Sequence, residues 1–392
     1  MKNFISSPFA MTFKKVKTMS RLIRSSKPVF PQDDINQILL GISKVLEEGQ
    51  FRNGKNVTIF ENMVAQYVGV KHAVAFDSDS SAYETALHYF GVKGKEVIVC
   101  TNSFVSVPNS VVAVGAKPVF ADIRADTLSM DPKSLRQNIS RNTCGVILTH
   151  ISGFPNPDLK AIINICKENK FFLIEDATHS IGSTVNGQKT GSFGDAAVFA
   201  FTPTKVLTTG EGGILVTNNA ELAGFAKRFS FYGSGAGKTN FVDLGRHMVL
   251  PEISAILGIY QLKRLDEFVA RRNEIARRYD LTLDKISAVQ TIKCPSGFRS
   301  AYYKYPLTLE GKIDKQKFTT SLFQDYAIET GNIFYPPCHM QGVYLKLGTC
   351  SYGSLATSER VLSRTITLPM HVALTDEYVD YVLEKVAALC QS

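Results

Sequence analysis

Long apolar runs, paired cysteines and a nucleotide-binding glycine motif are all missing from this chain of 392 residues. No apolar stretch approaches the roughly 20 residues of a membrane span, so we expect no integral membrane segment. None of the seven cysteines is spaced as C-x-x-C, which argues against a metal site or a disulfide framework and for a reducing cytoplasm. No G-x-G-x-x-G opens the first strand–helix unit. The glycine-rich run 233–239 ends in Gly-Lys-Thr like a P-loop, but the P-loop pattern requires a glycine at position 232, where this chain has Tyr232. These absences disfavour a dinucleotide-dependent oxidoreductase and a P-loop enzyme.

Acidic residues are missing from the N-terminus. Seven lysines and arginines precede the first acidic residue, Asp33, and removing those seven from the formal net charge of +9 leaves +2 for the rest of the chain. A nearly neutral body offers no basic groove, so we expect no nucleic-acid partner. We expect residues 1–27 to be a basic, disordered tail. A transit peptide and an upstream extension of the reading frame are the alternatives.

The remaining composition, with 44% hydrophobic and 20% charged residues, is typical of a soluble globular protein. Two helical patterns, from about residue 33 to Gly49 and through Phe60, Val64 and Tyr67, come first. Short apolar runs then alternate with helix-like segments, which predicts a largely parallel sheet covered on both faces, with ligands at the carboxyl ends of its strands. These runs are 73–76, 97–100, 118–123, 146–151, 171–174, 196–201 and 214–216.

The pattern changes twice in the second half of the chain. A long helical stretch begins near Pro251 with one apolar stripe, and after about residue 295 a smaller mixture of strands and helices follows, with strands at 302–309 and 365–368. The sequence therefore predicts an α/β fold with a large domain (28–250), a long connecting helix (251–294) and a small C-terminal domain (295–392).

Lys205 is the strongest candidate for a catalytic residue. It lies between the apolar run 196–201 and the glycine cluster 210–213. A lysine so placed is poorly hydrated and loses its proton more easily, and only the neutral amine attacks an aldehyde such as that of pyridoxal 5'-phosphate (PLP). The alternative is an ordinary solvated lysine near a turn.

Three further stretches supply groups that such a cofactor needs. Ser81 and Glu84 fit a capping box directly after the run 73–76, so a helix that begins there would direct amide and hydroxyl donors at a phosphate. An ordinary helix cap is the alternative. Phe104 follows the run 97–100 and could lie flat on an aromatic ring, although a core position explains it as well.

The third stretch contains two candidate residues. Asp176 closes the run 171–174, and an acidic residue there needs a partner such as a protonated pyridine nitrogen. His179 would then lie near the phenolic oxygen of the cofactor. A histidine satisfied within the core is its alternative.

Together these residues resemble the DegT/DnrJ/EryC1/StrS family of PLP-dependent sugar aminotransferases. The resemblance runs from about Lys27 to the C-terminus and includes the segments EDATHS, GSFGDAAVFAF, PTKVLTTGEGG, GQFRNGKNVTIFE, PEISAILGIYQL, YPPCHMQGVY and TLPMH. It implies a fold-type-I aminotransferase in the cytoplasm. It also implies an obligate homodimer in which each active site is completed by the neighbouring subunit.

The resemblance also implies roles for single residues and for the substrates. Lys205 would bind PLP covalently, Asp176 would pair with the pyridine nitrogen and His179 would contact the ring hydroxyl. Phe104 would stack on the ring, while Ser78 and Ser80 would hold the phosphate. An amino acid, by family habit L-glutamate, would donate its amino group to a nucleotide-linked keto sugar used for polysaccharide, O-antigen or glycoside synthesis.

Four positions depart from the family pattern. The usual Ser-Gly-Thr of the family is Ser78-Asp79-Ser80 here, so Asp79 replaces the glycine. Ala200 replaces a serine, and His247 and Val249 replace an asparagine and an arginine. The asparagine reaches the phosphate of the partner subunit, so a protonated His247 is a candidate cation for that phosphate and for Asp79. A non-catalytic or regulatory relative with an altered phosphate site is the alternative function. Retention of Lys205 together with Asp176 favours the enzyme.

Overall fold

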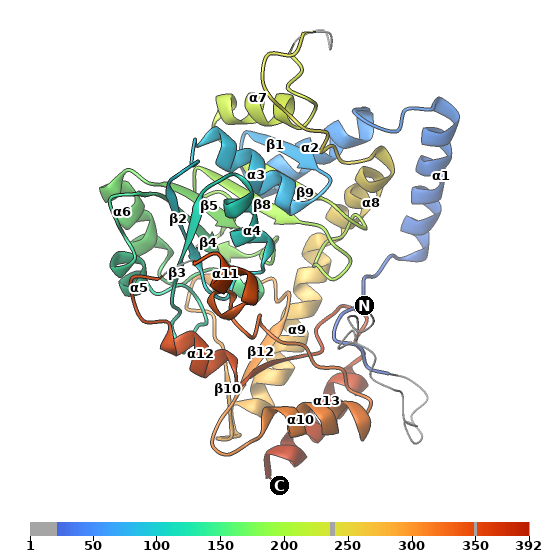
Figure 1. Cartoon of the computed structure of the whole chain (residues 1–392). Helices are drawn as coiled ribbons and strands as arrows, with labels where there is room; N and C mark the ends of the chain where they lie inside the picture. Colours follow the sequence, from blue (N-terminus) through green and yellow to red (C-terminus); the bar gives the residue numbers. More distant parts are fainter. Residues whose placement is uncertain (1–21, 236–239, 349–350, 392) are drawn as a thin grey trace, which may run out of the picture.

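A seven-stranded sheet lies at the centre of the computed structural model, which describes residues 22–235, 240–348 and 351–391 (Figure 1). The strand order is β1-β9-β8-β5-β4-β2-β3; β9 runs antiparallel to both of its neighbours, and the other pairs are parallel. The strands are β1 (His72–Phe76), β2 (Glu96–Cys100), β3 (Lys117–Ala121), β4 (Thr143–Thr149), β5 (Phe172–Asp176), β8 (Ala196–Ala200) and β9 (Gly213–Thr217). All seven predicted strands and the mostly parallel α/β fold are confirmed.

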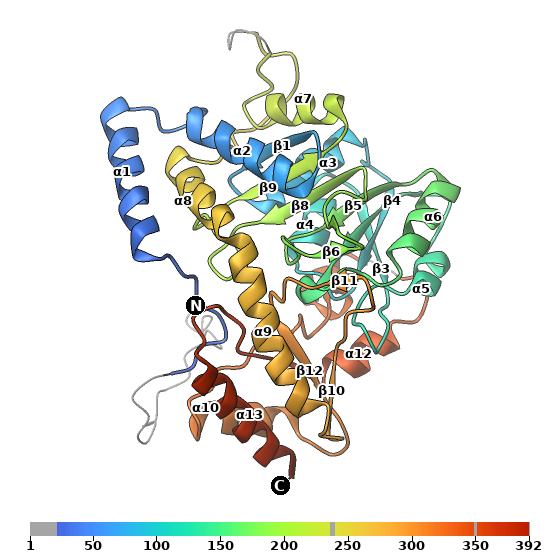
Figure 2. The same ribbon diagram turned by 180° about the vertical axis from the view of Figure 1, so that it is seen from behind.

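The strands are apolar throughout because both faces of the sheet are covered. In β2, Val97 and Val99 join one hydrophobic cluster, whereas Ile98 and Cys100 point to the other face and join another. Helices lie on both sides of the sheet in the two opposite views (Figures 1 and 2). The helices of this part are α1 (Gln32–Glu48), α2 (Lys55–Val68), α3 (Asp79–Tyr89), α4 (Ser106–Ala113), α5 (Pro132–Gln137), α6 (Leu159–Asn169) and α7 (Ala220–Phe229).

The predicted connecting helix is two helices. The first, α8 (Glu252–Lys263), ends at Arg264, and the second, α9 (Leu265–Leu283), ends well before residue 294. The apolar residues of α8 serve two partners, since Ala255 belongs to the cluster that contains α2, whereas Ile256 packs against α1. The expectation of one helix with one stripe was therefore wrong.

The C-terminal part has a small sheet of its own. Its strand order is β10-β12-β13, with both pairs antiparallel. One hydrophobic cluster contains Ile98 and Val146 of the large sheet together with Leu307 and Ile366 of the small one, so the two sheets share a core. The elements of this part are β10 (Val289–Thr291), β12 (Tyr305–Leu309), β13 (Thr365–Leu368), α10 (Lys315–Gln324), α11 (Gly342–Lys346), α12 (Ala356–Leu362) and α13 (Asp376–Gln391). A third sheet consists of β6 (Thr184–Val185), β7 (Gln188–Lys189) and β11 (Phe298–Arg299). Two single turns of 3-10 helix, Ile151–Gly153 and Cys338–Met340, complete the structure.

The segment 22–27 is ordered, in contrast to the disordered tail expected for 1–27. Ile23 is 3% exposed and pairs through its backbone with Ala327 and Glu329. The carboxylate of Glu329 accepts hydrogen bonds from the backbone N–H and the hydroxyl of Ser25 at 2.8 and 3.0 Å. The buried side chain of Ile23 and its backbone hydrogen bonds to Ala327 and Glu329 hold this segment in place. The rest of the expected tail, residues 1–21, and residues 236–239 of the rejected P-loop lie outside the described residues.

Neither a membrane span nor a metal site is found among the described residues. None of the helices in those ranges combines the length and apolar character that crossing a membrane requires. Across the same ranges, no three or more histidine, cysteine, aspartate or glutamate residues are grouped so that they could hold a metal ion.

Candidate active site

A cavity of about 360 Å³ lies where the large sheet meets the C-terminal part. One side of the cavity, which we call the sheet wall, consists of residues that follow strands of the large sheet: Asp79, Phe104, His179, Ala200, Thr202, Thr204 and Lys205. The other side, the C-terminal wall, consists of the ordered N-terminal segment and residues of the C-terminal part: Ser25, Ser26, Tyr303, Lys304, Gly331, Phe334 and Thr367. The cavity thus brings together chain segments that are far apart in the sequence.

Lys205 projects from the bend that follows β8. Its backbone N–H donates to the carbonyl of Thr202 at 3.1 Å, and the side chain is half-buried, with its ammonium 4.8 Å from the centroid of the Tyr303 ring. The glycine cluster after it has a clear steric role. A side chain at Gly213 would collide with the backbone of Ser78 and Asp79, so glycine lets the start of β9 approach the start of α3.

Asp176 is buried at the end of β5, 1% exposed, beneath the cavity. One carboxylate oxygen accepts hydrogen bonds from the Tyr83 hydroxyl at 2.7 Å and from the hydroxyl and N–H of Thr178 at 2.7 and 3.2 Å. Among the described residues, the other oxygen accepts from the Thr149 hydroxyl alone, at 2.8 Å. These donors fix the orientation of the carboxylate, while the second oxygen can accept a further hydrogen bond.

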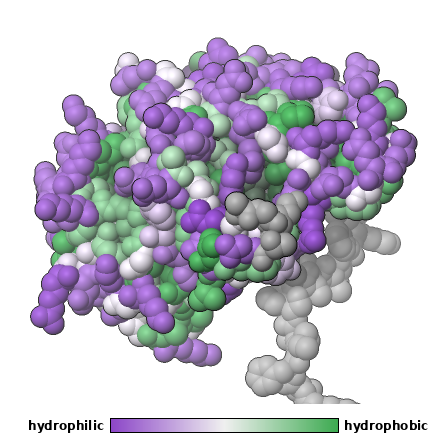
Figure 3. All heavy atoms as spheres, turned by 90° about the horizontal axis from the view of Figure 1, so that it is seen from above, coloured by the Kyte–Doolittle hydropathy of each residue, from purple (hydrophilic) through white to green (hydrophobic). Residues whose placement is uncertain are grey.

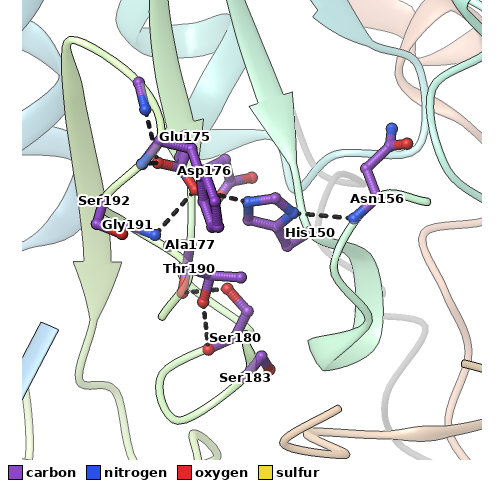
Figure 4. Close-up of polar contacts among 12 residues, drawn as sticks. His150, Asn156, Glu175, Asp176, Ala177, Ser180, Ser183, Thr190, Gly191 and Ser192 are labelled. Carbon is purple, nitrogen blue, oxygen red and sulfur yellow. Dashed lines mark hydrogen bonds and ion pairs between the residues drawn. The ribbon is translucent and has the colours of Figure 1, made fainter. Parts of the chain in front are cut away.

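Glu175, the neighbour of Asp176, fastens the surrounding loops to β5 (Figure 4). Its carboxylate is fully buried and accepts hydrogen bonds from the backbone N–H groups of Gly191, Phe193 and Gly194 and from Nε2 of His150 at 2.9 Å. Nδ1 of His150 accepts from the N–H of Asn156 at 3.2 Å, so the proton of the neutral imidazole is on Nε2. The loops after β4 and before β8 are therefore fixed beside Asp176.

His179 lines the cavity and carries a buried nitrogen without a partner. Its Nδ1 accepts from the N–H of Ser152 at 3.3 Å, and its Nε2 is buried and has no hydrogen-bond partner among the described residues. The ring stacks on Tyr303 with 4.4 Å between centroids. Burial, followed by the charges of Lys205 and Lys304, holds the imidazole pKa well below its usual value. The neutral ring consequently carries its proton on Nε2, the atom that lacks a partner.

Helix α3 begins between β1 and the cavity, but its cap differs from the prediction. Ser78, not Ser81, is the capping residue, and its hydroxyl accepts from the Ser81 N–H at 3.2 Å. Glu84 lies beside Arg246 instead of closing a capping box. The sequence suggested Ser81 because a glutamate follows it three residues later. The cap is therefore Ser78, with Ser80 in the first turn of the helix.

Asp79 is directed into the cavity. Its carboxylate accepts a hydrogen bond from the Ser106 hydroxyl at 3.0 Å. Burial raises the pKa of this carboxyl group, and the charge of Lys205 partly opposes that increase. Within the subunit the cation that acts on Asp79 is Lys205; the action of a protonated His247 across a subunit boundary stays a prediction.

Phe104 and His247 occupy very different positions. Phe104 is 50% exposed and lines the cavity, with its ring tilted against Phe334 at 5.5 Å between centroids. His247 is exposed and is not part of the cavity; its Nε2 accepts a hydrogen bond from Arg52 at 3.0 Å, and its ring lies beside Tyr232. Four of the predicted cofactor residues thus line the cavity, namely Asp79, Phe104, His179 and Lys205, whereas Ser78, Ser80, Asp176 and His247 are not among its lining residues. The cofactor roles of all these residues, including that of His247 across a subunit boundary, stay predictions.

The residues of the sheet wall, together with Asp176 at the end of β5, fit PLP. The orphaned Nε2–H of His179 suits a phenolic oxygen, the second oxygen of Asp176 can accept from a pyridinium nitrogen, and Lys205 provides an amine. Fold and site together define the class, a PLP-dependent aminotransferase with an α/β fold.

The comparisons with known proteins give the family. The profile of the DegT/DnrJ/EryC1/StrS aminotransferase family matches residues 32–387, so the chain belongs to that family and the resemblance is confirmed. The spore coat polysaccharide biosynthesis protein SpsC of Bacillus subtilis is 32% identical, with 95% of this chain and 98% of SpsC aligned. A UDP-4-amino-4,6-dideoxy-N-acetyl-beta-L-altrosamine transaminase of Campylobacter jejuni is also 32% identical, over 83% of this chain and 87% of its own. The crystal structure of the aminotransferase TlmJ from Streptoalloteichus hindustanus has a TM-score of 0.87 at 30% identity and covers 94% of this chain and 99% of its own.

The sequence analysis missed the C-terminal wall and the donors around Asp176. Tyr303 and Lys304 stand at the start of a predicted strand, and no local pattern indicates that they reach the cavity. Tyr83 lies four residues after Asp79, on the same face of α3. That helical spacing was the one available signal that its hydroxyl would be close to the site.

Proposed function

We propose that this enzyme transfers the amino group of an α-amino acid to a keto sugar carried on a nucleotide, with L-glutamate as the expected amino donor. The observation that carries the proposal is the unpaired Nε2–H of His179 in a cavity that also holds Lys205. The name of the altrosamine transaminase, which contains a UDP-linked amino sugar, supports the sugar acceptor. The name of SpsC supports a role in polysaccharide synthesis.

The residues of the sheet wall divide the work. PLP, when bound, supplies an electron-withdrawing ring that stabilises negative charge on the carbon that loses its proton. Asp176 offers a carboxylate oxygen to the pyridine nitrogen, His179 donates a hydrogen bond from Nε2, and Lys205 accepts and returns a proton at Nζ. The ring contact of Lys205 with Tyr303 holds the amine in the cavity.

We also propose a homodimer with shared active sites. Large apolar side chains are exposed on α1 and on the loop after α7, among them Leu39 and Leu40 at 59% and 58% and Leu244 at 93%. Hydrophobic side chains lie among hydrophilic ones on the face seen from above (Figure 3). His247 belongs to this loop, and its exposure, outside the cavity of its own subunit, supports a contact with the site of a partner. The six described cysteines are free thiols, which supports work in the reducing cytoplasm.

Chemical trapping tests the role of Lys205. Borohydride reduction of the protein saturated with PLP should leave a pyridoxyl group on Lys205, found by peptide mass spectrometry. Lys205→Ala should abolish amino transfer from L-glutamate to a panel of UDP-, GDP- and dTDP-linked keto sugars and should leave the fold unchanged, as judged by circular dichroism.

Lys189→Ala is the matched control, because Lys189 also lies over a tyrosine ring, 4.1 Å from the Tyr67 centroid, but outside the cavity. It should retain both the adduct at Lys205 and the activity. Wild-type protein without any adduct at Lys205, or Lys205→Ala with near-normal turnover, would contradict the proposal. An adduct without transfer to any keto sugar would instead point to a regulatory relative.

A further inference from the structure

A second lysine, Lys304, lines the same cavity as Lys205. Its ammonium donates to the carbonyl of Asn332 at 2.9 Å and lies 5.5 Å from the centroids of both the Tyr303 and Phe334 rings. In the described ranges it has no carboxylate within ion-pair distance. The cavity therefore contains a half-buried cation whose partners are a carbonyl and two aromatic faces.

The backbone around Lys304 is firmly held. Arg272, 4% exposed, donates hydrogen bonds to the carbonyls of Tyr302 and Met370, both at 2.9 Å. Tyr302, two residues before Lys304, and Phe334, whose ring lies beside the Lys304 ammonium, both have a φ of 45°, in the left-handed region that non-glycine residues rarely adopt. Such preorganisation is typical of a binding group and is not needed for a lysine that only faces water.

The position of Lys304 is electrostatically unfavourable in the absence of an anion. Burial lowers the pKa of the Lys304 ammonium, Tyr303 opposes that change, and the charge of Lys205 adds to it. Lys205 and Lys304 contact the same Tyr303 ring, so two like charges are close together. An anion that enters the cavity recovers this cost, because it supplies the missing partner.

The substrates of the proposed reaction carry three anionic groups, and the inference rests on that proposed function: the two carboxylates of L-glutamate and the diphosphate of the acceptor. The γ-carboxylate lies three bonds from the carbon that carries the reacting amino group. The α-carboxylate of the amino donor is bonded to the carbon that carries the reacting amino group. The diphosphate of the acceptor is separated from the reacting carbon by the sugar ring. Because Lys304 shares the Tyr303 ring with Lys205, we propose that Lys304 binds the α-carboxylate of the amino donor and so selects α-amino acids.

The test follows the first half-reaction, in which the PLP form of the dimeric enzyme reacts with L-glutamate and its absorbance changes. Lys304→Met should raise the apparent Kd for L-glutamate about 10- to 100-fold, as expected for loss of a hydrogen bond to a charged group, with a smaller change in the limiting rate. Lys304→Arg keeps the charge and should restore much of the affinity. Lys315→Met is the matched control, because Lys315 donates to the Leu362 carbonyl at 3.2 Å and lies over the Tyr335 ring but does not line the cavity.

An amino donor that lacks the negative charge of the α-carboxylate identifies the group that Lys304 contacts. Wild type should react far less well with L-isoglutamine, in which that carboxylate is an amide, than with L-glutamate, and the difference should largely disappear in Lys304→Met. A merely structural lysine would not change this discrimination.

The remaining outcomes separate the two hypotheses. If Lys304→Met instead raises the KM of the nucleotide-linked keto sugar and leaves L-glutamate binding unchanged, Lys304 binds the diphosphate and the proposal is overturned. Unchanged binding of both substrates would also overturn it. If the wild-type enzyme reacts with no L-amino acid, the proposed function fails before Lys304 is tested.

Discussion

The two walls of the cavity are built in opposite ways. At the end of β5, next to the sheet wall, two carboxylates are buried and each has several partners: Asp176 accepts four hydrogen bonds and Glu175 accepts four. On the C-terminal wall, Lys304 has one carbonyl partner and no described carboxylate partner, and the backbone turns through left-handed residues. Fully partnered buried charges give a fixed geometry. A charge with spare bonding capacity is available to a ligand.

This difference suggests a division of labour. The sheet wall holds the groups that suit the cofactor, and these must keep one arrangement throughout the reaction. The C-terminal wall holds groups that await a substrate, and it can change without disturbing the sheet.

The largest expected effect is the loss of Glu175. Glu175→Ala leaves three backbone N–H groups and the His150 Nε2–H buried without their acceptor, so we expect a loss of about 3–5 kcal/mol in the free energy of unfolding. Glu329→Ala removes a carboxylate from the C-terminal side, where its partners are the N–H and hydroxyl of half-buried Ser25. It should cost about 1–2 kcal/mol. Urea unfolding of both variants measures their free energies of unfolding. Equal losses in the two variants would show that the two walls are held equally firmly.

The next effect is catalytic. Asp176→Asn keeps the shape and an acceptor for Tyr83 but loses the negative charge, so the amino-transfer rate should fall about 100-fold or more. The Kd for PLP, from absorbance titration, should change less than tenfold. Lys304→Met on the other wall should show the reverse split, with a large change in donor affinity and a small change in rate. A normal rate with lost PLP binding would make Asp176 only an anchor.

The same contrast explains how far the sequence could predict the structure. The strands were predictable because strands buried on both faces are apolar at every position, and Lys205, Asp176 and His179 follow such strands directly. The C-terminal wall was not, since Ser25 and Lys304 reach the cavity through tertiary contacts that leave no local pattern. The break at Arg264 was hidden because the apolar spacing continues across it. The strands at 289–291 and 298–299 are too short for a period of two to be visible.

The smallest expected effect concerns Asp79, the cavity residue whose charge opposes the cofactor. Its carboxylate lies in the first turn of α3, where a negative charge stabilises the helix by about 0.3–1 kcal/mol. If the phosphate of PLP binds at this helix end, as the family resemblance implies, the two anions compete for the same positive environment. Burial raises the Asp79 pKa, while Lys205 and Ser106 lower it and Asp176 raises it. The neutral form therefore persists to higher pH than for an ordinary aspartate.

The sign of the pH dependence follows from this raised pKa. Below it Asp79 is neutral and does not repel the phosphate; above it the carboxylate is charged, so PLP affinity should fall as pH rises through the raised pKa. Asp79→Asn should bind PLP a few times more tightly at pH 8, about 1 kcal/mol, and should lose that part of the pH dependence. Asp33→Asn is the control, since Asp33 lies in the first turn of α1 outside the cavity. Fluorescence titrations with PLP between pH 5 and 8 decide the matter. Parallel curves for wild type and Asp79→Asn would mean that Asp79 does not face the phosphate and that its charge acts within the subunit, toward Lys205 and Ser106.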